Sequence, residues 1–465
     1  MKDLKDNIGK EVIVAGWVDI RRDQGKMVFF DFRDMTGKVQ CVVLPNHAEA
    51  IEKAKEIRPE WVLKVSGIVN KRPEKNVKAD VLNGDVELEV TGIEVLNKAD
   101  TAPFAINEDT ANVNEDLRMQ YKYLDLRTDR MQKNIRMRHK IVKLIRDYLD
   151  KENFTEVETP ILTKSTPEGA RDYVVPSRIW QGKFYALPQS PQQYKQLLMA
   201  GGIERYFQIA KCMRDEDTRG DRQPEFTQFD LEMSFVERED VMALNEKLLI
   251  NIVQTLYPEK KIQEIPFPRI TYKEAMEKYG NDRPDFRNDK EDKNLLAFGW
   301  VVDFPFFERT DKSDNPQAEG EWTFTHNPFS RPKDEHMPNL MEKKDISNIL
   351  TSQYDIILNG YEIGGGSIRN HEYEALQKVF EILGHKIEDI EKNFGHMLHA
   401  FKTGTPPHGG IAWGLDRLVM LLQNEPNIRE VMAFPKSGEG KDLMMNSPSE
   451  ISEKQLKELD IKLSK

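Results

Sequence analysis

The chain has 465 residues, of which 32% are charged and 38% hydrophobic, and its formal net charge is −11. This length exceeds what one ordinary core needs and predicts two or three domains. The negative balance weighs mildly against a protein that coats nucleic acid, although it is compatible with a local basic face. Because no apolar run approaches the roughly 18 residues that span a bilayer, and the N-terminus lacks an apolar signal region, we expect a cytoplasmic protein without a membrane span.

Residues 11–96 have the pattern of a small β-barrel. A helical stretch at 47–57 separates the third and fourth of five strand-like runs, which occupy residues 11–21, 27–34, 38–44, 61–69 and 85–96. This is the order of elements in an OB-fold, a barrel that binds single-stranded nucleic acids and oligosaccharides. We therefore predict an OB-fold domain over residues 1–100 and a linker or hinge over residues 101–126.

The pattern changes from about Arg127. Apolar residues recur there at the spacing of a long amphipathic helix, at Met131, Ile135, Ile141, Val142, Ile145 and Leu149. Strands of alternating polarity, glycine-rich loops and a closing helix follow, and most of the strands resemble antiparallel hairpins. The larger domain, residues 127–465, is therefore predicted to be α+β, so the whole chain combines a β domain with an α+β domain.

The sequence contains no P-loop, no dinucleotide-binding glycine motif, and no signature of a zinc protease or serine hydrolase. A nucleotide would therefore be held by side chains and a metal ion. The polar loop at 217–223 favours this interpretation, because Arg214, Arg219 and Arg222 lie in it or beside it and guanidinium groups bind phosphate bidentately.

The strand that follows this loop has two distinct faces. Alternation places its apolar residues, Phe229, Leu231, Met233 and Phe235, on one side. The other side carries Gln228, Asp230, Glu232 and Ser234. These residues form either a polar floor for a binding site or a solvated sheet face.

An Asn-Gly pair at 359–360 predicts a two-residue hairpin turn. Folding about it places Asp355 opposite Gly364, and puts Asp355 and Glu362 on one face as diagonal neighbours roughly 7–8 Å apart. Two acids at that spacing can chelate Mg²⁺ together with phosphate oxygens. The three glycines that begin at Gly364 allow close backbone approach, and Arg369 beyond them is placed to meet an anion. The alternative is a surface hairpin with two solvated acids.

Residues 408–423 predict a short strand that turns at Gly414 into a helix. The core face of this helix consists of Leu415, Leu418, Val419 and Leu422. Arg417 lies in its first turn, where the helix dipole disfavours a cation. A bound anion would benefit from both the guanidinium group and the helix N-terminus. The alternative is an ordinary amphipathic helix with an exposed arginine.

The order of these segments is more specific than any one of them. Residues 154–172, 212–228 and 409–421 resemble motifs 1, 2 and 3 of the class II aminoacyl-tRNA synthetases. The stretches TPEGARD, ALPQSPQQYKQLL and NGYEIGGGSIR resemble the aspartyl-tRNA synthetases of the bacterial type. The resemblance implies an antiparallel sheet flanked by helices, preceded by an anticodon-binding OB domain, and a homodimer built partly through motif 1.

The resemblance also implies an enzyme that activates L-aspartate with ATP and Mg²⁺ and transfers it to the 3′ end of tRNA(Asp). The implied catalytic residues are Arg214, Glu216 and Arg417, and the implied metal ligands are Asp355 and Glu362. No protein nucleophile is needed, because positioning and electrostatics supply the catalysis. The implied ATP contacts are Arg214, Asp215, Glu216, Gln223, Glu362, Gly414, Leu415, Asp416 and Arg417.

The aspartate contacts implied by the resemblance are Glu168, Ser190, Gln192, Lys195, Asp230, His326 and Arg369. Of these, Lys195 and Arg369 would meet the side-chain carboxylate and select against asparagine, whose amide would leave buried charge unpaired. The implied anticodon contacts are Arg22, Phe29, Gln40 and Glu87. A base can stack on Phe29, and one of the neighbours Phe29 and Phe30 is expected to be core because they face opposite ways.

The sequence departs from the bacterial pattern in three places. The large domain between motifs 2 and 3 is absent, and a shortened segment near residues 285–296 takes its place. His326-Asn327 replaces the usual His-His pair, which affects how the amino group and the tRNA end are handled. Gln24 occupies a loop position that bears on tRNA discrimination, so tRNA(Asn) is a candidate substrate beside tRNA(Asp).

Three alternative functions fit parts of the sequence. An asparaginyl- or lysyl-tRNA synthetase is disfavoured by Lys195 opposite the substrate side chain. A non-catalytic nucleic-acid-binding paralogue would tend to lose the metal acids or the ATP arginines, which are all present. An amide-forming ligase on the same catalytic domain would generally lack the OB module.

Overall fold

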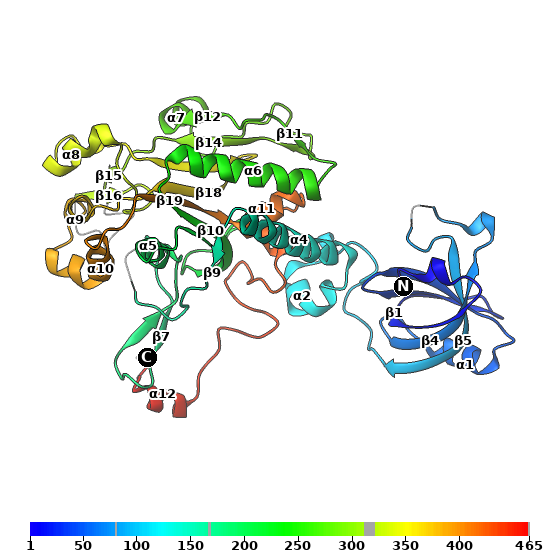
Figure 1. Cartoon of the computed structure of the whole chain (residues 1–465). Coiled ribbons are helices and arrows are strands. Elements are labelled where there is room, and N and C mark those ends of the chain that lie inside the picture. Colours follow the sequence, from blue (N-terminus) through cyan, green and yellow to red (C-terminus); the bar gives the residue numbers. More distant parts are fainter. Residues whose placement is uncertain (80, 166–168, 311–320, 464–465) are drawn as a thin grey trace. The chain divides into compact units, whose positions relative to one another are not determined.

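The computed structural model describes residues 1–79, 81–165, 169–310 and 321–463. The chain divides into two compact units, Met1–Arg130 and Met131–Lys465, and Figure 1 traces both in sequence colours. None of the helices in the described ranges is long and apolar enough to cross a membrane.

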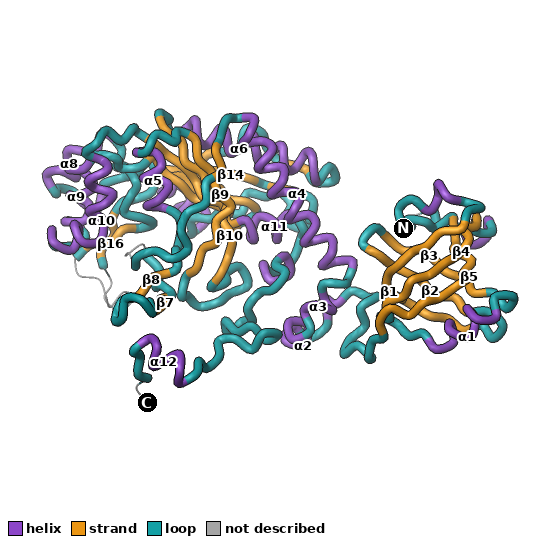
Figure 2. The backbone as a smooth tube through the Cα atoms, turned by 60° about the horizontal axis from the view of Figure 1, so that its bottom comes forward, coloured by secondary structure: helices purple, strands orange, loops and turns teal. Residues whose placement is uncertain are grey.

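The first unit is a closed barrel with the strand order β1-β2-β3-β5-β4 (Figure 2). The β3–β5 pair is parallel, and the apolar residues of the strands, such as Phe30 and Phe32, are fully buried in the barrel core. The predicted OB-fold is confirmed. Its elements are β1 (Glu11–Asp23), β2 (Val28–Asp34), β3 (Gly37–Val43), α1 (Ala48–Glu56), β4 (Val62–Lys71) and β5 (Val86–Asn97).

The stretch predicted as a linker contains two short helices, α2 (Glu115–Gln120) and α3 (Lys122–Asp125). Asp125 is fully buried and accepts hydrogen bonds from Thr110 Oγ1 and Lys122 Nζ, each at 2.7 Å. A small apolar cluster that includes Phe104 surrounds these helices. The stretch is therefore partly helical and has a small core of its own.

The second unit is built on an eight-stranded sheet with the order β12-β14-β17-β18-β19-β10-β9-β6. The pairs at its two edges, β12–β14 and β6–β9, are parallel, and the others are antiparallel. These strands are β6 (Thr155–Glu156), β9 (Arg205–Met213), β10 (Glu225–Ser234), β12 (Arg269–Thr271), β14 (Phe298–Val302), β17 (Gln353–Leu358), β18 (Tyr361–Ile368) and β19 (His408–Gly414).

Three helices pack on one face of this sheet and share its main core: α4 (Asp129–Lys151), α6 (Arg238–Leu256) and α11 (Leu415–Leu422). Figure 1 shows α6, α4 and α11 alongside the sheet. A separate apolar cluster joins α9 (Tyr373–Ile382) and α10 (Ile387–Phe401). The remaining helices are α5 (Gln192–Ala200), α7 (Tyr272–Tyr279), α8 (Met337–Glu342) and α12 (Glu453–Leu459). The remaining strands are β7 (Val174–Pro176), β8 (Phe184–Ala186), β11 (Lys261–Ile262), β13 (Leu295–Leu296), β15 (Phe307–Arg309) and β16 (Trp322–Phe324).

The alternation predicted for residues 226–235 holds along β10 with one exception. Phe229, Leu231 and Met233 enter the main core, as expected. The prediction is wrong for Phe235, which is 67% exposed. The strand ends at Ser234, and the backbone of Phe235 turns into the left-handed region with φ 58°. The polar face of β10 therefore lies on the side of the sheet that points away from α4, α6 and α11.

Candidate active site

A cavity of about 410 Å³ lies over the polar face of β10. Its floor comes from alternate residues of three neighbouring strands: Asp230 on β10, Ala412 on β19 and Gly365 on β18. The helix α5 and the loop between β9 and β10 supply further walls. The three segments singled out in the sequence therefore meet at one cavity.

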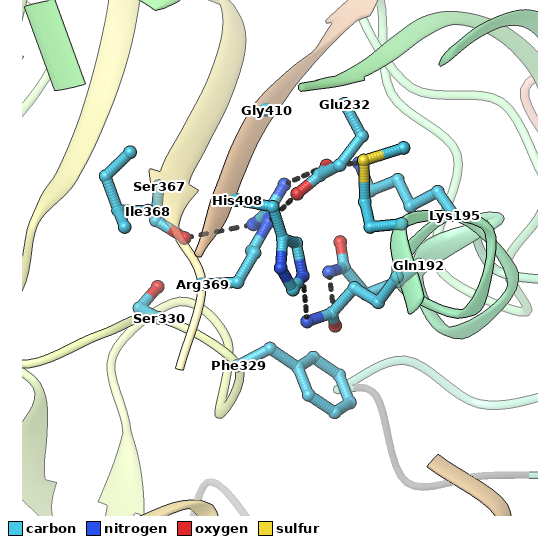
Figure 3. A network of polar contacts seen from close by, with 12 residues as sticks. Gln192, Lys195, Glu232, Phe329, Ser330, Ser367, Ile368, Arg369, His408 and Gly410 are labelled. Carbon is cyan, nitrogen blue, oxygen red and sulfur yellow. Dashed lines mark hydrogen bonds and ion pairs between the residues drawn. The ribbon is translucent and has the colours of Figure 1, made fainter. Parts of the chain in front are cut away.

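One end of the cavity holds a buried group of two cations, Lys195 and Arg369, and two carboxylates, Asp230 and Glu232. Figure 3 shows Lys195, Arg369 and Glu232 of this group. Arg369 donates from Nε to Oε1 of Glu232 at 2.8 Å and from Nη2 to Oε2 at 3.0 Å. Lys195 Nζ lies 2.9 Å from Oδ2 of Asp230 and 3.2 Å from Oε2 of Glu232. Each of the four side chains is at most 3% exposed. Glu232 thus joins both cations.

Both cations keep donors for a ligand. A guanidinium group has five N–H donors and an ammonium group has three. Arg369 uses two on Glu232 and one on Ser367 Oγ, at 3.0 Å from Nη1. Lys195 uses two, on Asp230 and Glu232. The donors that have no partner among the described residues suit a carboxylate, which only accepts hydrogen bonds.

The pKa values of the two buried carboxylates shift in opposite directions in this environment. Burial raises the pKa of Asp230 above its usual range despite the nearby Lys195. Burial acts in the same direction on Glu232, but Arg369 and Lys195 outweigh it and lower the pKa of Glu232 to about 2. Glu232 is therefore the firmly ionised partner of the two cations.

The other end of the cavity carries two arginines. Arg214 lies over the ring of Phe226, 5.2 Å from its centroid. Arg417 donates from Nη2 to Oδ2 of Asp221 at 3.1 Å and from Nη1 to the backbone oxygen of Glu362. The Nε atoms of both arginines are buried and lack a hydrogen-bond partner within the described part of the chain. A ligand rich in acceptor oxygens would satisfy them.

Asp355 and Glu362 both line the cavity, but the predicted pairing of their strands is wrong by one residue. Asp355 pairs with Gly365 instead of Gly364, because a β-bulge between Ile356 and Ile357 of β17 adds one residue to β18. The two acids still lie together: a Cβ on Gly365 would be 2.6 Å from Oδ1 of Asp355 and 3.7 Å from Oε1 of Glu362. A side chain at this position would collide with the carboxylate of Asp355, which explains the glycine.

This pair of acids fits a divalent cation. Asp355 is 3% exposed, and burial together with the charge of Glu362 raises its pKa well above the usual range. A cation would reverse that shift and stabilise both carboxylates. Among residues 1–79, 81–165, 169–310 and 321–463, no group of three or more His, Cys, Asp or Glu side chains could hold a metal. Two carboxylates suffice for Mg²⁺ when a phosphate supplies further oxygens.

Most of the predicted catalytic-domain residues that the structure describes line the cavity, and two of them do not. Asp215 is exposed outside the lining, Leu415 is buried in the main core, and Glu168 lies outside the described residues. The residues that the structure brings together are Ser190, Gln192, Lys195, Arg214, Glu216, Gln223, Asp230, His326, Asp355, Glu362, Arg369, Gly414, Asp416 and Arg417.

Asp416 has its carboxylate engaged within the protein. It accepts a hydrogen bond from the backbone N–H of Thr227 at 2.8 Å, and a second from Arg138. These contacts tie α11 to β10 and α4. Asp416 thus holds the site together, in addition to lining it.

The lining or neighbouring residues that sequence reasoning left unassigned include Glu232, Asp221 and Phe226. Glu232 stood out only as part of the polar row on β10. The counter-charge that an arginine or lysine needs in a buried site was the signal that could have identified it.

Asn327 replaces the second histidine of the usual His-His pair, and its side chain forms hydrogen bonds within its own loop. Its Oδ1 accepts hydrogen bonds from the backbone N–H of Phe329 at 3.0 Å and from Ser330 Oγ at 3.3 Å. The neighbouring His326 packs edge-on against Phe304, and burial lowers its pKa. His326 is therefore a neutral group at the cavity wall.

The four predicted anticodon residues lie on the outer face of the barrel. Gln40 pairs with Glu87 across β3 and β5, and Arg22 pairs with Phe29 across β1 and β2. Phe29 is half-buried, whereas Phe30 is fully buried in the core. Arg72, which was not singled out, donates to Oε1 of Gln40. These side chains form one row of polar groups with an accessible aromatic ring.

Comparison with known proteins agrees with this geometry. Residues 114–438 match the family described as tRNA synthetases class II (D, K and N), and residues 12–96 match the OB-fold nucleic acid binding domain. The chain belongs to the class II tRNA synthetases.

Within that class, the chain belongs to the family of the aspartate–tRNA ligases. It is 41% identical to the aspartate–tRNA ligase of Staphylococcus saprophyticus, with 98% of this chain and 97% of the relative covered. It is 40% identical to the enzyme of Staphylococcus aureus, at the same coverage. The first alignment extends over 577 positions, so more than a hundred positions of the relative have no counterpart among the 465 residues here.

Solved structures share the fold. Asparaginyl-tRNA synthetase from Pyrococcus horikoshii, complexed with asparaginyl-adenylate, has a TM-score of 0.73 and 24% identity, covering 93% of this chain and 96% of that one. Aspartyl-tRNA synthetase from Entamoeba histolytica has a TM-score of 0.72 and 24% identity, covering 92% of this chain and 89% of that one.

Proposed function

We propose that the chain activates L-aspartate with ATP and transfers it to the 3′ end of tRNA(Asp). The observation that carries this proposal is the convergence of three groups on one cavity: the Lys195–Arg369 pair, the arginines Arg214 and Arg417, and the acids beside Gly365. The Lys195–Arg369 pair suits the side-chain carboxylate of aspartate, the two arginines suit the phosphates of ATP, and the two acids suit a Mg²⁺ ion bound with those phosphates.

The proposed reaction has two steps. An oxygen of the aspartate α-carboxylate attacks the α-phosphorus of ATP, a mixed anhydride forms and pyrophosphate leaves. A hydroxyl of the terminal adenosine of tRNA then attacks the carbonyl carbon and AMP leaves. The proposed role of Arg214, which lines the cavity, is to stabilise charge on the transferring phosphate.

Selectivity for aspartate follows from the donors that Lys195 and Arg369 leave unused. A carboxylate accepts from both residues. The amide of asparagine would turn its own N–H groups toward one of them, leaving a buried donor without an acceptor. Lysine would bring a third cation to the group.

Asp355 and Glu362 are the proposed ligands of Mg²⁺. When bound, this ion would neutralise phosphate charge and orient the phosphate chain. Glu216 and Gln223 also line the cavity and are proposed ATP contacts. We further propose a cytoplasmic homodimer whose OB domain binds the anticodon through the row that includes Phe29 and Gln40.

ATP–pyrophosphate exchange tests the proposal without tRNA. Aspartate should support exchange at least a hundredfold better, in kcat/KM, than asparagine or lysine, which corresponds to about 2.7 kcal/mol. Faster exchange with asparagine or lysine would refute the assignment. Charging of purified tRNA(Asp) and tRNA(Asn) then distinguishes a discriminating enzyme from one that serves both tRNAs.

A further inference from the structure

Gln192, at the start of α5, is held by a chain of hydrogen bonds that begins at His408 on β19 (Figure 3). His408 Nδ1 lies 2.8 Å from the backbone oxygen of Pro406, and His408 Nε2 lies 3.1 Å from Nε2 of Gln196. Gln192 in turn donates from Nε2 to Oε1 of Gln196 at 3.0 Å. His408 and Gln196 are fully buried, and Gln192 lines the cavity.

The partners along this chain leave one consistent direction for its hydrogen bonds. A backbone oxygen only accepts, so Nδ1 of His408 carries the proton that it donates to Pro406. In a neutral ring Nε2 then only accepts, and Gln196 must donate to it. The oxygen of the Gln196 amide therefore faces Gln192 and accepts from it.

His408 is held neutral by its surroundings. Burial lowers its pKa to about 4, although the nearby Glu232 favours the charged form. Arg369 and His371, the other titratable groups that act on it, both disfavour a second positive charge. The hydrogen-bond direction is thus the one expected near neutral pH.

We propose that His408 is a positioning residue for the amino acid: through Gln196 it fixes the amide of Gln192 so that the Gln192 oxygen accepts from the substrate ammonium group. This inference rests on the proposed function. An ammonium group has donors only, so a Gln192 amide turned the other way would place donor against donor. This chain of hydrogen bonds, the His408–Gln196–Gln192 relay, keeps the Gln192 amide out of the wrong orientation before the substrate binds.

A purely structural role for His408 makes a different prediction. His408 is fully buried, and its loss could simply loosen β19. Tyr354 provides a matched control, because it donates from Oη to the backbone oxygen of Gly410 on the same strand at 3.0 Å and is also fully buried. Tyr354 lies in the main core and does not line the cavity.

Steady-state ATP–pyrophosphate exchange on the full-length chain separates the two roles. His408→Asn keeps a donor near Nδ1 but loses the acceptor at Nε2, and should raise the aspartate KM about tenfold while the ATP KM changes less than twofold. His408→Gln restores an acceptor near Nε2 and should recover most of this loss. Tyr354→Phe should leave the aspartate KM within twofold of wild type. Should His408→Asn fold poorly, Gln196→Met breaks the same relay and carries the same expectation.

A double-mutant cycle completes the test. In a Gln192→Ala background, His408→Asn should have no further effect on the aspartate KM, because the group that it positions is gone. The inference would be overturned if His408→Asn changed the aspartate KM and the ATP KM equally. It would also be overturned if His408→Asn raised the aspartate KM by the same factor in the wild type and in Gln192→Ala. Absence of aspartate-dependent exchange in the wild type would instead refute the proposed function. The ammonium group is common to all amino acids, so the cycle is then run with whichever amino acid supports exchange.

Discussion

At the scale of single residues, Glu232 is central to the site because it balances two buried cations at once. Its carboxylate contacts Arg369 through two hydrogen bonds and Lys195 through an ion pair. Buried charges that are paired and hydrogen-bonded can persist, whereas an unpaired one is costly. Glu232 thereby balances the charges of Lys195 and Arg369 and holds both side chains in place before any ligand arrives.

Replacing this carboxylate should destabilise the catalytic unit strongly. Glu232→Gln removes the negative charge but keeps the size of the side chain, so Arg369 and Lys195 are left undercompensated. We expect the free energy of unfolding to fall by about 3–5 kcal/mol, measured by urea denaturation. Glu225→Gln is the control. Glu225 forms an ion pair with Lys211, and both side chains are about half exposed. A loss for Glu232→Gln as small as that of the control would contradict the role of Glu232.

Arg369 should matter to the amino acid far more than to the nucleotide. Arg369→Ala removes two free donors from the proposed carboxylate site and leaves the arginines of the nucleotide end untouched. The aspartate KM should rise by about a hundredfold, with at most a small change in the ATP KM. The measurement is pyrophosphate exchange with one substrate varied at a time. Equal changes in both KM values would argue against the role.

At the scale of elements, the sheet separates core from site by alternation. Phe229, Leu231 and Met233 of β10 belong to the core that α4, α6 and α11 share. Phe226, Gln228 and Asp230, on the other face of the strand, line the cavity. This separation was predictable, because the period of a strand is visible in a single sequence. The end of β10 was not predictable, since Phe235 continues the apolar pattern but leaves the strand.

The hairpin of β17 and β18 also has a feature that the sequence alone could not predict. The Asn-Gly turn was predictable from its residues. The bulge near Ile357 was not, because it adds one residue without any local sequence signal, and so it shifted the partner of Asp355. Contacts such as Arg369–Glu232 join positions 137 residues apart, and no periodicity reports such a distance. The role of Glu232 therefore required the folded structure.

A methyl group at Gly365 should disable the metal-binding face of the hairpin. A Cβ there would be 2.6 Å from Oδ1 of Asp355 and would force the carboxylate to move. Gly365→Ala should lower the rate of aspartate activation at least tenfold and raise the Mg²⁺ concentration needed for half-maximal exchange. Gly92→Ala in the barrel is the control, because its Cβ would meet Ser66 at an ordinary 3.8 Å. Normal magnesium dependence in Gly365→Ala would count against the metal site.

At the scale of the whole molecule, the two compact units divide the proposed work. The barrel carries the row of polar groups with Phe29, and the larger unit carries the cavity. The division was foreseeable from the switch between short strands and a long amphipathic helix near Arg127. The helices α2 and α3 were not, because each is very short and α2 is capped by Asn114, whose side chain also suits a turn.

A substitution in the barrel should therefore affect tRNA without affecting activation. Phe29→Ala removes a stacking surface worth about 1–3 kcal/mol per base. The Kd for tRNA(Asp) should rise roughly tenfold or more, while pyrophosphate exchange without tRNA is unchanged. Phe30→Ala would not serve as a control, because Phe30 is in the core. A parallel loss of exchange activity in Phe29→Ala would show that the two units do not divide the work in this way.

The central claim is that one cavity binds the amino acid, the phosphate and the nucleoside together. A crystal structure with a non-hydrolysable aspartyl-adenylate analogue tests it directly. The side-chain carboxylate should lie between Lys195 and Arg369, and the phosphate mimic should lie beside Arg214. Binding of the analogue with its carboxylate away from Lys195 and Arg369, or outside this cavity, would contradict the account.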